Sequence, residues 1–376
     1  MQVDYDIAIV GGGLAGLAAS IQLSKRGYRV IVFEKDSYPA HKVCGEYVSL
    51  ESWDFLTSLG LPLKELDLPI INTLILTAPN GKTLTTKLPL GGFGISRYQL
   101  DSSLAQIAIN NGVTVLQNTK VDDVKFFDQY IISHSGQTIK ARLCSLAYGK
   151  RSNLDVKWNR PFVQDQNARL NNYVGIKYHV KTDWPPNVIG LHNFQNGYCG
   201  ISRIEDDKYC LCYMTKAENL KSSSGNIDQM QEKILFKNPH LKTIFKSADV
   251  LQNFPITISQ ISFSQKSKIE NGMLMLGDSA GMITPLCGNG MSIALHTSKI
   301  ATNLIADFLE NKVSQNDLNN QYEKQWQQNF ASRLKTGRLI QSFFGSNSLS
   351  NALVASFNFF PFLKTPLIKL THGKPF

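Results

Sequence analysis

The sequence predicts an α/β protein, α+β overall, in which a Rossmann-like nucleotide-binding domain is interleaved with a second domain built on an antiparallel sheet. Three observations predict this fold. The chain opens with an apolar strand, a glycine-rich turn and an apolar helix. Strand-like alternation dominates residues 172–214. At 376 residues the chain exceeds one ordinary core, which favours two closely packed domains with helices after them.

The first element is a strand that ends at Val10 and runs into a G-x-G-x-x-G turn formed by Gly11, Gly13 and Gly16. In such a turn the first glycine permits the tight bend, the second lets the backbone approach a pyrophosphate, and the third lets helix and strand pack closely. The next strand ends on Glu34, about 20 residues on, where an acid can bind a ribose. The opening therefore predicts a dinucleotide site.

The elements that follow alternate between two sheets. After a loop at 36–49 we expect a helix at 50–59, a hairpin at 73–87 outside the first sheet, a helix from 95 to 111, and a returning strand at 112–116. A β-rich region follows at 124–139, with a short buried strand at 144–147. The strands of the second domain occupy 172–214, then a lysine-rich helical span at 226–247 and a strand at 254–260. A strand at 272–276, a helix at 292–308 and a helical C-terminus complete the chain.

Composition narrows the function classes. The hydrophobic content of 43% and charged content of 18% are typical of a globular protein. The net charge of +10 is dispersed, without a basic run interleaved with aromatic residues, so we expect no nucleic-acid partner. Six cysteines without a CxxC pair indicate neither a zinc site nor a disulfide framework. No run approaches the roughly 20 apolar residues of a membrane span, so we expect a cytoplasmic protein.

Three distant segments, taken together, resemble the p-hydroxybenzoate-hydroxylase-type superfamily of FAD-dependent oxidoreductases. They are the glycine turn, the segment Ile95-Ser-Arg97 with Leu100, and the strand end Gly277-Asp278. That superfamily contains aromatic hydroxylases, squalene-epoxidase-like enzymes, flavin halogenases and geranylgeranyl reductases. The resemblance runs from residue 4 to about 305 and implies FAD as cofactor, with NAD(P)H as electron donor.

The resemblance also implies roles for particular residues. The glycine turn would hold the FAD pyrophosphate, Glu34 the adenosine ribose, and Arg97 a phosphate or the ribityl chain. Asp278 would bind a ribityl hydroxyl, and the turn from Pro285 to Met291 would face the isoalloxazine. The full set of expected cofactor-binding residues is Gly11, Gly13, Leu14, Ala15, Gly16, Glu34, Lys35, Cys44, Gly45, Arg97, Val121, Gly149, Gly277, Asp278, Gly288, Asn289, Gly290 and Met291.

Departures from the superfamily pattern bear on the reaction. Many hydroxylases have an Asp-Gly pair where this chain has Tyr148-Gly149, which puts the usual handling of NADPH in doubt. The loop with Cys44, Gly45 and Glu46 resembles the Cys-Gly segment of geranylgeranyl reductases. The segment 197–202 lacks both tryptophans of the halogenase motif. The lysine that a halogenase would need could be Lys82 or Lys87, but both can equally be interpreted as exposed charges on a hairpin.

We predict a flavin monooxygenase that hydroxylates or epoxidises a lipophilic substrate, because oxygenation is the commoner reaction in the superfamily. A geranylgeranyl-reductase-like ene-reductase is the close alternative; a halogenase and a non-catalytic flavoprotein are less favoured. Candidate proton donors are Cys44, Glu46 and Cys287, although each also has a structural interpretation. His179 and His192 lie on predicted strands, where a core or surface histidine is commoner than a catalytic one.

We expect the FAD-binding domain to comprise residues 1–70, 95–155 and 265–310. The substrate-binding sheet would comprise 71–94 and 156–264, and a helical region 311–376. The second domain is rich in aromatic residues, which favours an apolar pocket for a lipophilic small molecule. The C-terminus mixes phenylalanines with lysines and arginines, so it could rest at a membrane interface or pack against the body.

Overall fold

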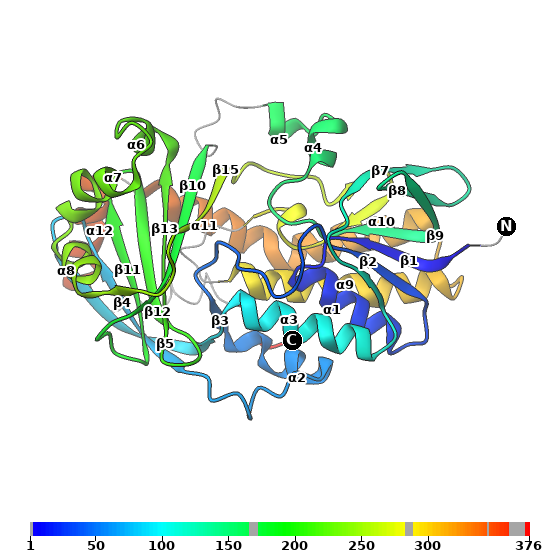
Figure 1. Ribbon diagram of the computed structural model, residues 1–376, viewed down its shortest axis with the longest axis horizontal. Helices are drawn as coiled ribbons and strands as arrows, with labels where there is room; N and C mark the ends of the chain where they lie inside the picture. The colour runs from blue at the N-terminus through cyan, green and yellow to red at the C-terminus, as the bar shows by residue number, and fades with distance from the viewer. Residues whose placement is uncertain (1–2, 165–171, 283–288, 344–345, 361–372) are drawn as a thin grey trace.

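The computed structural model describes residues 3–164, 172–282, 289–343, 346–360 and 373–376. Two sheets lie at opposite ends of the molecule, with helices packed around the first and on the outer face of the second (Figure 1). The first sheet combines parallel and antiparallel strands, and the second is antiparallel except for one parallel pair. The predicted fold class is therefore confirmed.

The first sheet has the strand order β16-β17-β9-β1-β2-β6, and the β7–β8 hairpin extends β9 antiparallel. The parallel neighbours of β1 are β2 and β9, as a nucleotide-binding sheet requires. The sequence placed strands at 124–139 without assigning them to this sheet. Its strands are β1 (Tyr5–Val10), β2 (Val30–Phe33), β6 (Thr114–Leu116), β7 (Val121–Phe126), β8 (Tyr130–His134), β9 (Gln137–Leu146), β16 (Ile269–Glu270) and β17 (Met273–Met275).

Three helices cover this sheet because their small and aliphatic residues permit close packing. Helix α1 (Leu14–Ser24) packs between α3 (Arg97–Asn110) and α9 (Gly290–Leu309). Nine of the eleven residues of α1 are buried, which explains its run of alanine, leucine and isoleucine. The side chain of Ser96 caps α3 by accepting a hydrogen bond from the Gln99 N–H at 3.1 Å. The ends of β1, β9 and β17 meet at the N-terminus of α1.

The second sheet has the order β14-β10-β13-β12-β11-β4-β5-β3, with β15 paired to β10. One face is covered by α6 (Ala217–Lys221), α7 (Ile227–Lys233) and α8 (Pro239–Ser247) (Figure 1). Its strands are β3 (Tyr47–Ser49), β4 (Ile70–Thr77), β5 (Thr83–Gly94), β10 (Tyr173–Lys181), β11 (Val188–Phe194), β12 (Gly197–Arg203), β13 (Tyr209–Lys216), β14 (Asp249–Val250) and β15 (Ile256–Ile261).

The expected single helical span at 226–247 is wrong, because the chain breaks between α7 and α8. Asn238 accepts a hydrogen bond from the His240 N–H and caps a new helix, whose first position is Pro239. Proline fits the first turn of a helix but not its interior, so the break follows from this pair.

Short helices and a helical C-terminus complete the structure. They are α2 (Trp53–Leu59), α4 (Asn153–Lys157), α5 (Pro161–Gln164), α10 (Gln315–Trp326), α11 (Ser332–Phe343) and α12 (Asn347–Phe359). In the part of the chain that the structure describes, every helix falls short of the length and apolarity that a membrane crossing demands.

Candidate functional site

The glycine turn is held against the ends of β9 and β2. Gly11 has φ +109°, and a Cβ there would lie 2.4 Å from the carbonyl oxygen of Ala147. A Cβ on Gly16 would lie 2.0 Å from the carbonyl oxygen of Gly11, so only glycine lets α1 pack this closely on the turn. The Gly12 N–H donates to Glu34 Oε2 at 2.7 Å. The glycines of the predicted turn and Glu34 therefore lie next to one another in the structure.

Arg97 reaches this turn from the first residue of α3. Its guanidinium makes two hydrogen bonds of 2.7 Å to the carboxylate of Asp101 and lies 3.7 Å from where a Cβ on Gly13 would stand. Burial lowers the pKa of Arg97, but the Asp101 carboxylate outweighs it and the pKa is raised, so the side chain stays charged. Lys42 Nζ adds a second cation 3.4 Å from Asp101 Oδ2. Two cations beside an N-terminal helix turn suit a pyrophosphate.

The Gly277–Asp278 turn lies beside the same helix. Gly277 has φ +61°, and a Cβ there would lie 3.3 Å from the Cβ of Ala15. Two hydrogen bonds to backbone carbonyls hold the turn in place. Lys266 Nζ donates to the Asp278 carbonyl at 2.9 Å, and Arg160 donates to the Ser279 carbonyl at 3.3 Å. The Asp278 carboxylate is half-buried and has no hydrogen-bond partner among the described residues. An unpaired carboxylate in this position can accept hydroxyl donors.

The other predicted cofactor residues are placed as follows. Leu14 and Ala15 are buried in the first turn of α1, and Met291 is buried in the first turn of α9, after Gly290 and the buried cap residue Asn289. Gly149 has φ +83° just after β9, Val121 begins β7, and Lys35 is exposed beside Asp36 at 3.7 Å. Cys287 and Gly288 lie outside the described residues. The cradle of glycines, paired cations and a free carboxylate fits a dinucleotide such as FAD.

Four consecutive carbonyl groups hold the loop before β3 in place, three of them through side chains of the second sheet and one through Lys150, which follows β9. The Lys42 carbonyl accepts from Lys177 Nζ at 3.1 Å and the Cys44 carbonyl from Cys210 Sγ at 3.2 Å. The carbonyls of residues 43 and 45 accept from Lys150 Nζ and Ser202 Oγ. Within the described chain, the N–H groups of residues 43–45 have no acceptor. The carbonyls thus fix the loop, and the N–H groups remain for a ligand.

Glu46 ends this loop with a side chain that is fully buried. Its backbone has φ +55°, and Oε1 accepts from Lys177 Nζ and, at 2.8 Å, from the Arg97 N–H. Oε2 lies 2.6 Å from His179 Nε2. Burial raises the pKa of Glu46, but the His179 hydrogen bond and the Lys177 charge outweigh it, and the pKa is lowered. The pKa of Lys177 falls through burial and rises more through Glu46.

This cluster also has the composition of a metal site. Glu46, His179 and Cys210 each place one ligand atom within 4.8 Å of the others. Lys177 already donates to Glu46, however, and its ammonium would repel a metal ion held by the same carboxylate. Burial also raises the pKa of the Cys210 thiol well above its usual value, which keeps it protonated. The cluster therefore serves acid–base chemistry better than metal binding.

The sheet face beside Glu46 changes from polar to apolar along its strands. Lys177 and Cys212 are register partners on β10 and β13, and Gly200 on β12 and Leu191 on β11 continue the row. Gly200, Cys212 and Leu191 are half-buried. Beyond them lies the apolar cluster Tyr173, Tyr198, Met214, Ile261, Phe263 and Met282. A face with a charged end, a floor of small residues and an apolar end suits an elongated lipophilic molecule.

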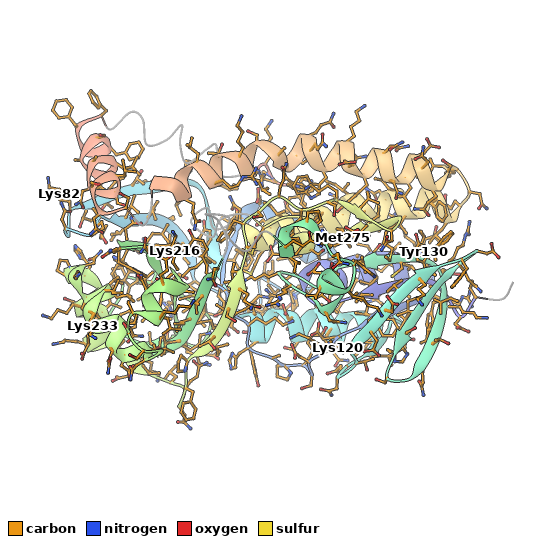
Figure 2. All side chains as sticks on the ribbon, turned by 90° about the horizontal axis from the view of Figure 1, so that it is seen from above. Lys82, Lys120, Tyr130, Lys216, Lys233 and Met275 are labelled. Carbon is orange, nitrogen blue, oxygen red and sulfur yellow. The ribbon has the colours of Figure 1, made fainter. Side chains whose placement is uncertain are left out.

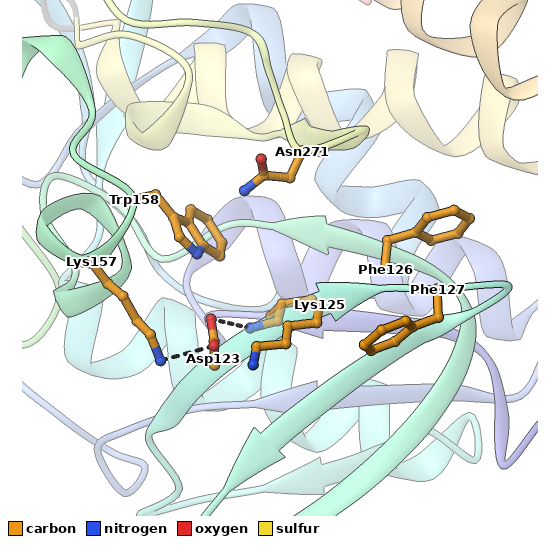
Figure 3. Close-up of a pocket in the computed structure, with 8 residues that line it drawn as sticks. Asp123, Lys125, Phe126, Phe127, Lys157, Trp158 and Asn271 are labelled. Carbon is orange, nitrogen blue, oxygen red and sulfur yellow. Dashed lines mark hydrogen bonds and ion pairs between the residues drawn. The ribbon is translucent and has the colours of Figure 1, made fainter.

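A cavity of about 590 Å³ opens elsewhere, beside the β7–β8 hairpin. Figure 3 shows Lys157 paired with Asp123 at 2.9 Å on one side and Phe126 and Phe127 on the other. None of its lining residues belongs to the loops described above. Lys82, one of the two lysines considered for a halogenase, is likewise remote, at the tip of the hairpin between β4 and β5 (Figure 2). Lys87, the other, is exposed on β5.

Sequence reasoning missed Lys177 as a site residue and gave His179 a structural role. The signal available was a lysine inside an otherwise apolar strand, since a charge in such a strand is costly unless it is paired. Its partner lies 131 residues earlier in the chain, so no local pattern could name it.

Comparison with known proteins identifies the class. A model of the FAD dependent oxidoreductase family matches residues 6–45, and a squalene epoxidase model matches residues 201–358. A digeranylgeranylglycerophospholipid reductase of Methanococcus vannielii is 25% identical over 87% of this chain and 83% of its own length. Conditioned medium factor receptor 1 of Dictyostelium discoideum is 25% identical over 87% of this chain and 68% of its own.

A solved structure of a flavin-dependent brominase has the same fold, with a TM-score of 0.77 at 18% identity over 98% of this chain and 93% of the other. The fold and these matches define an FAD-dependent oxidoreductase. The matches fit the FAD-dependent oxidoreductase superfamily that the resemblance predicted, and the chain is similar to a squalene epoxidase model and to a lipid reductase.

Proposed function

We propose that this enzyme is an FAD-dependent reductase that saturates a carbon–carbon double bond in a lipophilic, isoprenoid-type substrate. The observation that carries the proposal is the buried set of Glu46, Lys177 and His179 between the cofactor loops and the second sheet. Saturating an unactivated double bond requires a proton at carbon, and a buried acid can deliver it where water is excluded. The archaeal lipid reductase among the relatives supports the same chemistry.

In this proposal the residues of the glycine turn, with Glu34, Arg97 and Asp278, hold FAD. Bound FAD would supply the two electrons of the reduction. The free N–H groups of residues 43–45 orient the ring, because rigid donors cost little ordering on binding. The apolar end of the second sheet takes the hydrocarbon chain and excludes water. The buried set of Glu46, Lys177 and His179 supplies the proton that the substrate receives.

The second candidate is the monooxygenase that the sequence favoured. The observation in its favour is the squalene epoxidase model, which matches from β12 to α12. NAD(P)H is the proposed donor in both cases. A halogenase is less favoured, because Lys82 and Lys87 are exposed far from the cofactor loops.

The deciding experiment supplies the yellow protein with a geranylgeranyl lipid and NADPH, NADH or dithionite, with and without oxygen. Products are analysed by mass. A gain of two hydrogens without oxygen supports the reductase, and a gain of one oxygen atom only in air supports the monooxygenase. Neither product from any donor would argue for a non-catalytic flavoprotein. Gly16→Val, which cannot seat α1 on Gly11, serves as a cofactor-free control.

We also propose that the C-terminal helices contact a membrane that carries the substrate. Leu339 on α11 and Phe359 at the end of α12 are 60% and 78% exposed. Co-sedimentation with anionic liposomes should fall when both are replaced by Ser. Equal binding by the variant would exclude these helices as the contact.

A further inference from the structure

The segment between β15 and β16 returns the chain from the second sheet to the first, and its buried side carries two lysines. Side chains along residues 265–268 alternate between exposed and buried positions, and the buried positions hold Lys266 and Lys268, which are 5% and 8% exposed. Apolar residues normally fill such positions, because an ammonium group is costly to remove from water. The contacts of these lysines must therefore offset that cost.

Lys266 connects the loops that form the proposed cofactor site. Its Nζ donates to the carbonyls of Asp278 and Lys150, each at 2.9 Å. Lys150 in turn donates from its own Nζ to the Val43 carbonyl at 3.1 Å. The Lys266 ammonium also lies over the ring of Phe162, 4.5 Å from its centroid. Two ammonium groups thus link the Asp278 turn, the segment after β9 and the loop before β3.

Arg160 supports the same turn, but carboxylates neutralise its charge. It is 1% exposed and donates to the Ser279 carbonyl at 3.3 Å. It also pairs with Asp155 at 2.8 Å and with Glu270 at 3.2 Å. Tyr148 donates to the same Asp155 oxygen at 2.6 Å and holds this carboxylate in place. A buried charge that is paired in this way is explained by the fold alone.

The charge of Lys266 is not neutralised by a carboxylate. Among the residues that the structure describes, none forms an ion pair with its ammonium. Burial lowers the pKa of Lys266 to about 8, although the more distant charges of Asp155 and Asp278 act in the opposite direction. The side chain is therefore charged at neutral pH, and its burial costs the fold free energy. A net positive charge is thus placed beside the proposed cofactor site.

We propose that Lys266 raises the reduction potential of the bound flavin by placing an unpaired positive charge behind the Asp278 turn. Reduction adds negative charge to a flavin, and a nearby cation in a buried site stabilises that charge. Lys266 is a positioning residue, because its hydrogen bonds go to the backbone of the cofactor loops. The inference rests on the FAD site of the proposed function, and not on the reaction catalysed there.

The experiment measures the midpoint potential of FAD bound to the full chain, without substrate. Lys266→Gln removes the charge but keeps a donor for one of the two carbonyls. We expect the affinity for reduced FAD relative to oxidised FAD to fall about tenfold, which lowers the two-electron potential by about 30 mV. The matched control is Lys268→Gln, because Lys268 is similarly buried but lies over the Trp326 ring of α10, 4.1 Å from its centroid.

The control variant should keep the wild-type potential. An unchanged potential in Lys266→Gln would overturn the proposal, and so would an equal fall in Lys266→Gln and Lys268→Gln. If the wild-type chain leaves the geranylgeranyl lipid unchanged but the potential falls only in Lys266→Gln, the reductase function fails and the role of Lys266 stands. If the lipid is reduced and all three potentials agree, the reductase function stands and the role of Lys266 fails.

A second measurement separates this role from a structural one. The free energy of unfolding of the full chain without FAD should be equal or higher in Lys266→Gln, because the unpaired buried charge is gone. Lys266→Met, a second neutral variant, should lower the potential of bound FAD to a similar extent. If both variants fail to fold, Lys266 is required by the fold itself, and the proposal is overturned.

Discussion

The two faces of strand β10 differ in what their residues do. Ile176 and Tyr178 point to the helix side, where they belong to the apolar cluster under α7 and α8. Lys177 and His179 point the other way and hold Glu46. The helix face is stabilised by packing alone. The opposite face, here called the loop face, holds the buried Lys177–Glu46 ion pair, whose charges are costly to bury unless they are paired. The comparison teaches that β10 supports the fold with one face and the site with the other.

Removing the Lys177 ammonium from the loop face should cause the largest loss of stability. In Lys177→Met the Glu46 carboxylate stays buried without its ammonium partner, so we expect the free energy of unfolding to fall by about 3–5 kcal/mol. Denaturant titration measures it. The double variant Glu46→Gln, Lys177→Met leaves no unpaired charge and should recover most of the loss. If it recovers nothing, Lys177 acts through packing and the contrast between the faces is lost.

A substitution on the helix face should have a smaller effect on the free energy of unfolding and no effect on the bound cofactor. Ile176 is fully buried, so Ile176→Val should lower the free energy of unfolding by about 1 kcal/mol. The absorbance spectrum of bound FAD and its reduction by dithionite should match those of the wild type. A shifted flavin spectrum would mean that the two faces are coupled through the strand.

The difference between the faces also explains what the sequence could predict. The glycine turn and Glu34 were found because strand, turn and helix are adjacent in the chain, and the alternation in 173–180 located β10. Lys177 and His179 were not found as site residues because their partner belongs to a loop more than 130 residues away. That pairing depends on how two sheets dock, which no local periodicity specifies. The cofactor roles of the individual residues stay predictions.

The pH dependence of stability should separate the faces further. The pKa of Glu46 is lowered on folding, so its contribution is present above its unfolded pKa and lost as the pH falls through the folded value. The pKa of Lys177 is raised, so its contribution is lost as the pH rises through the folded value. Glu46→Gln should flatten the acid side of the stability profile. Ile176→Val should lower the profile equally at every pH, and a changed slope would contradict this.

The smallest effect on stability is expected at Gly200, on the loop side of the sheet but away from the charges. A Cβ there would meet Leu191 Cδ2 at 3.6 Å and the Cys212 carbonyl at 3.7 Å, which are ordinary contacts. Gly200→Ala should therefore fold and keep FAD, with the free energy of unfolding changed by about 0.5 kcal/mol or less. Gly200→Leu places a larger side chain on the same face of the sheet. If this row is the floor under the substrate, KM for a long isoprenoid lipid should rise severalfold, with Gly200→Ala nearly unchanged. An unaltered KM in Gly200→Leu would place the substrate elsewhere and leave the loop face with a proton-handling role alone.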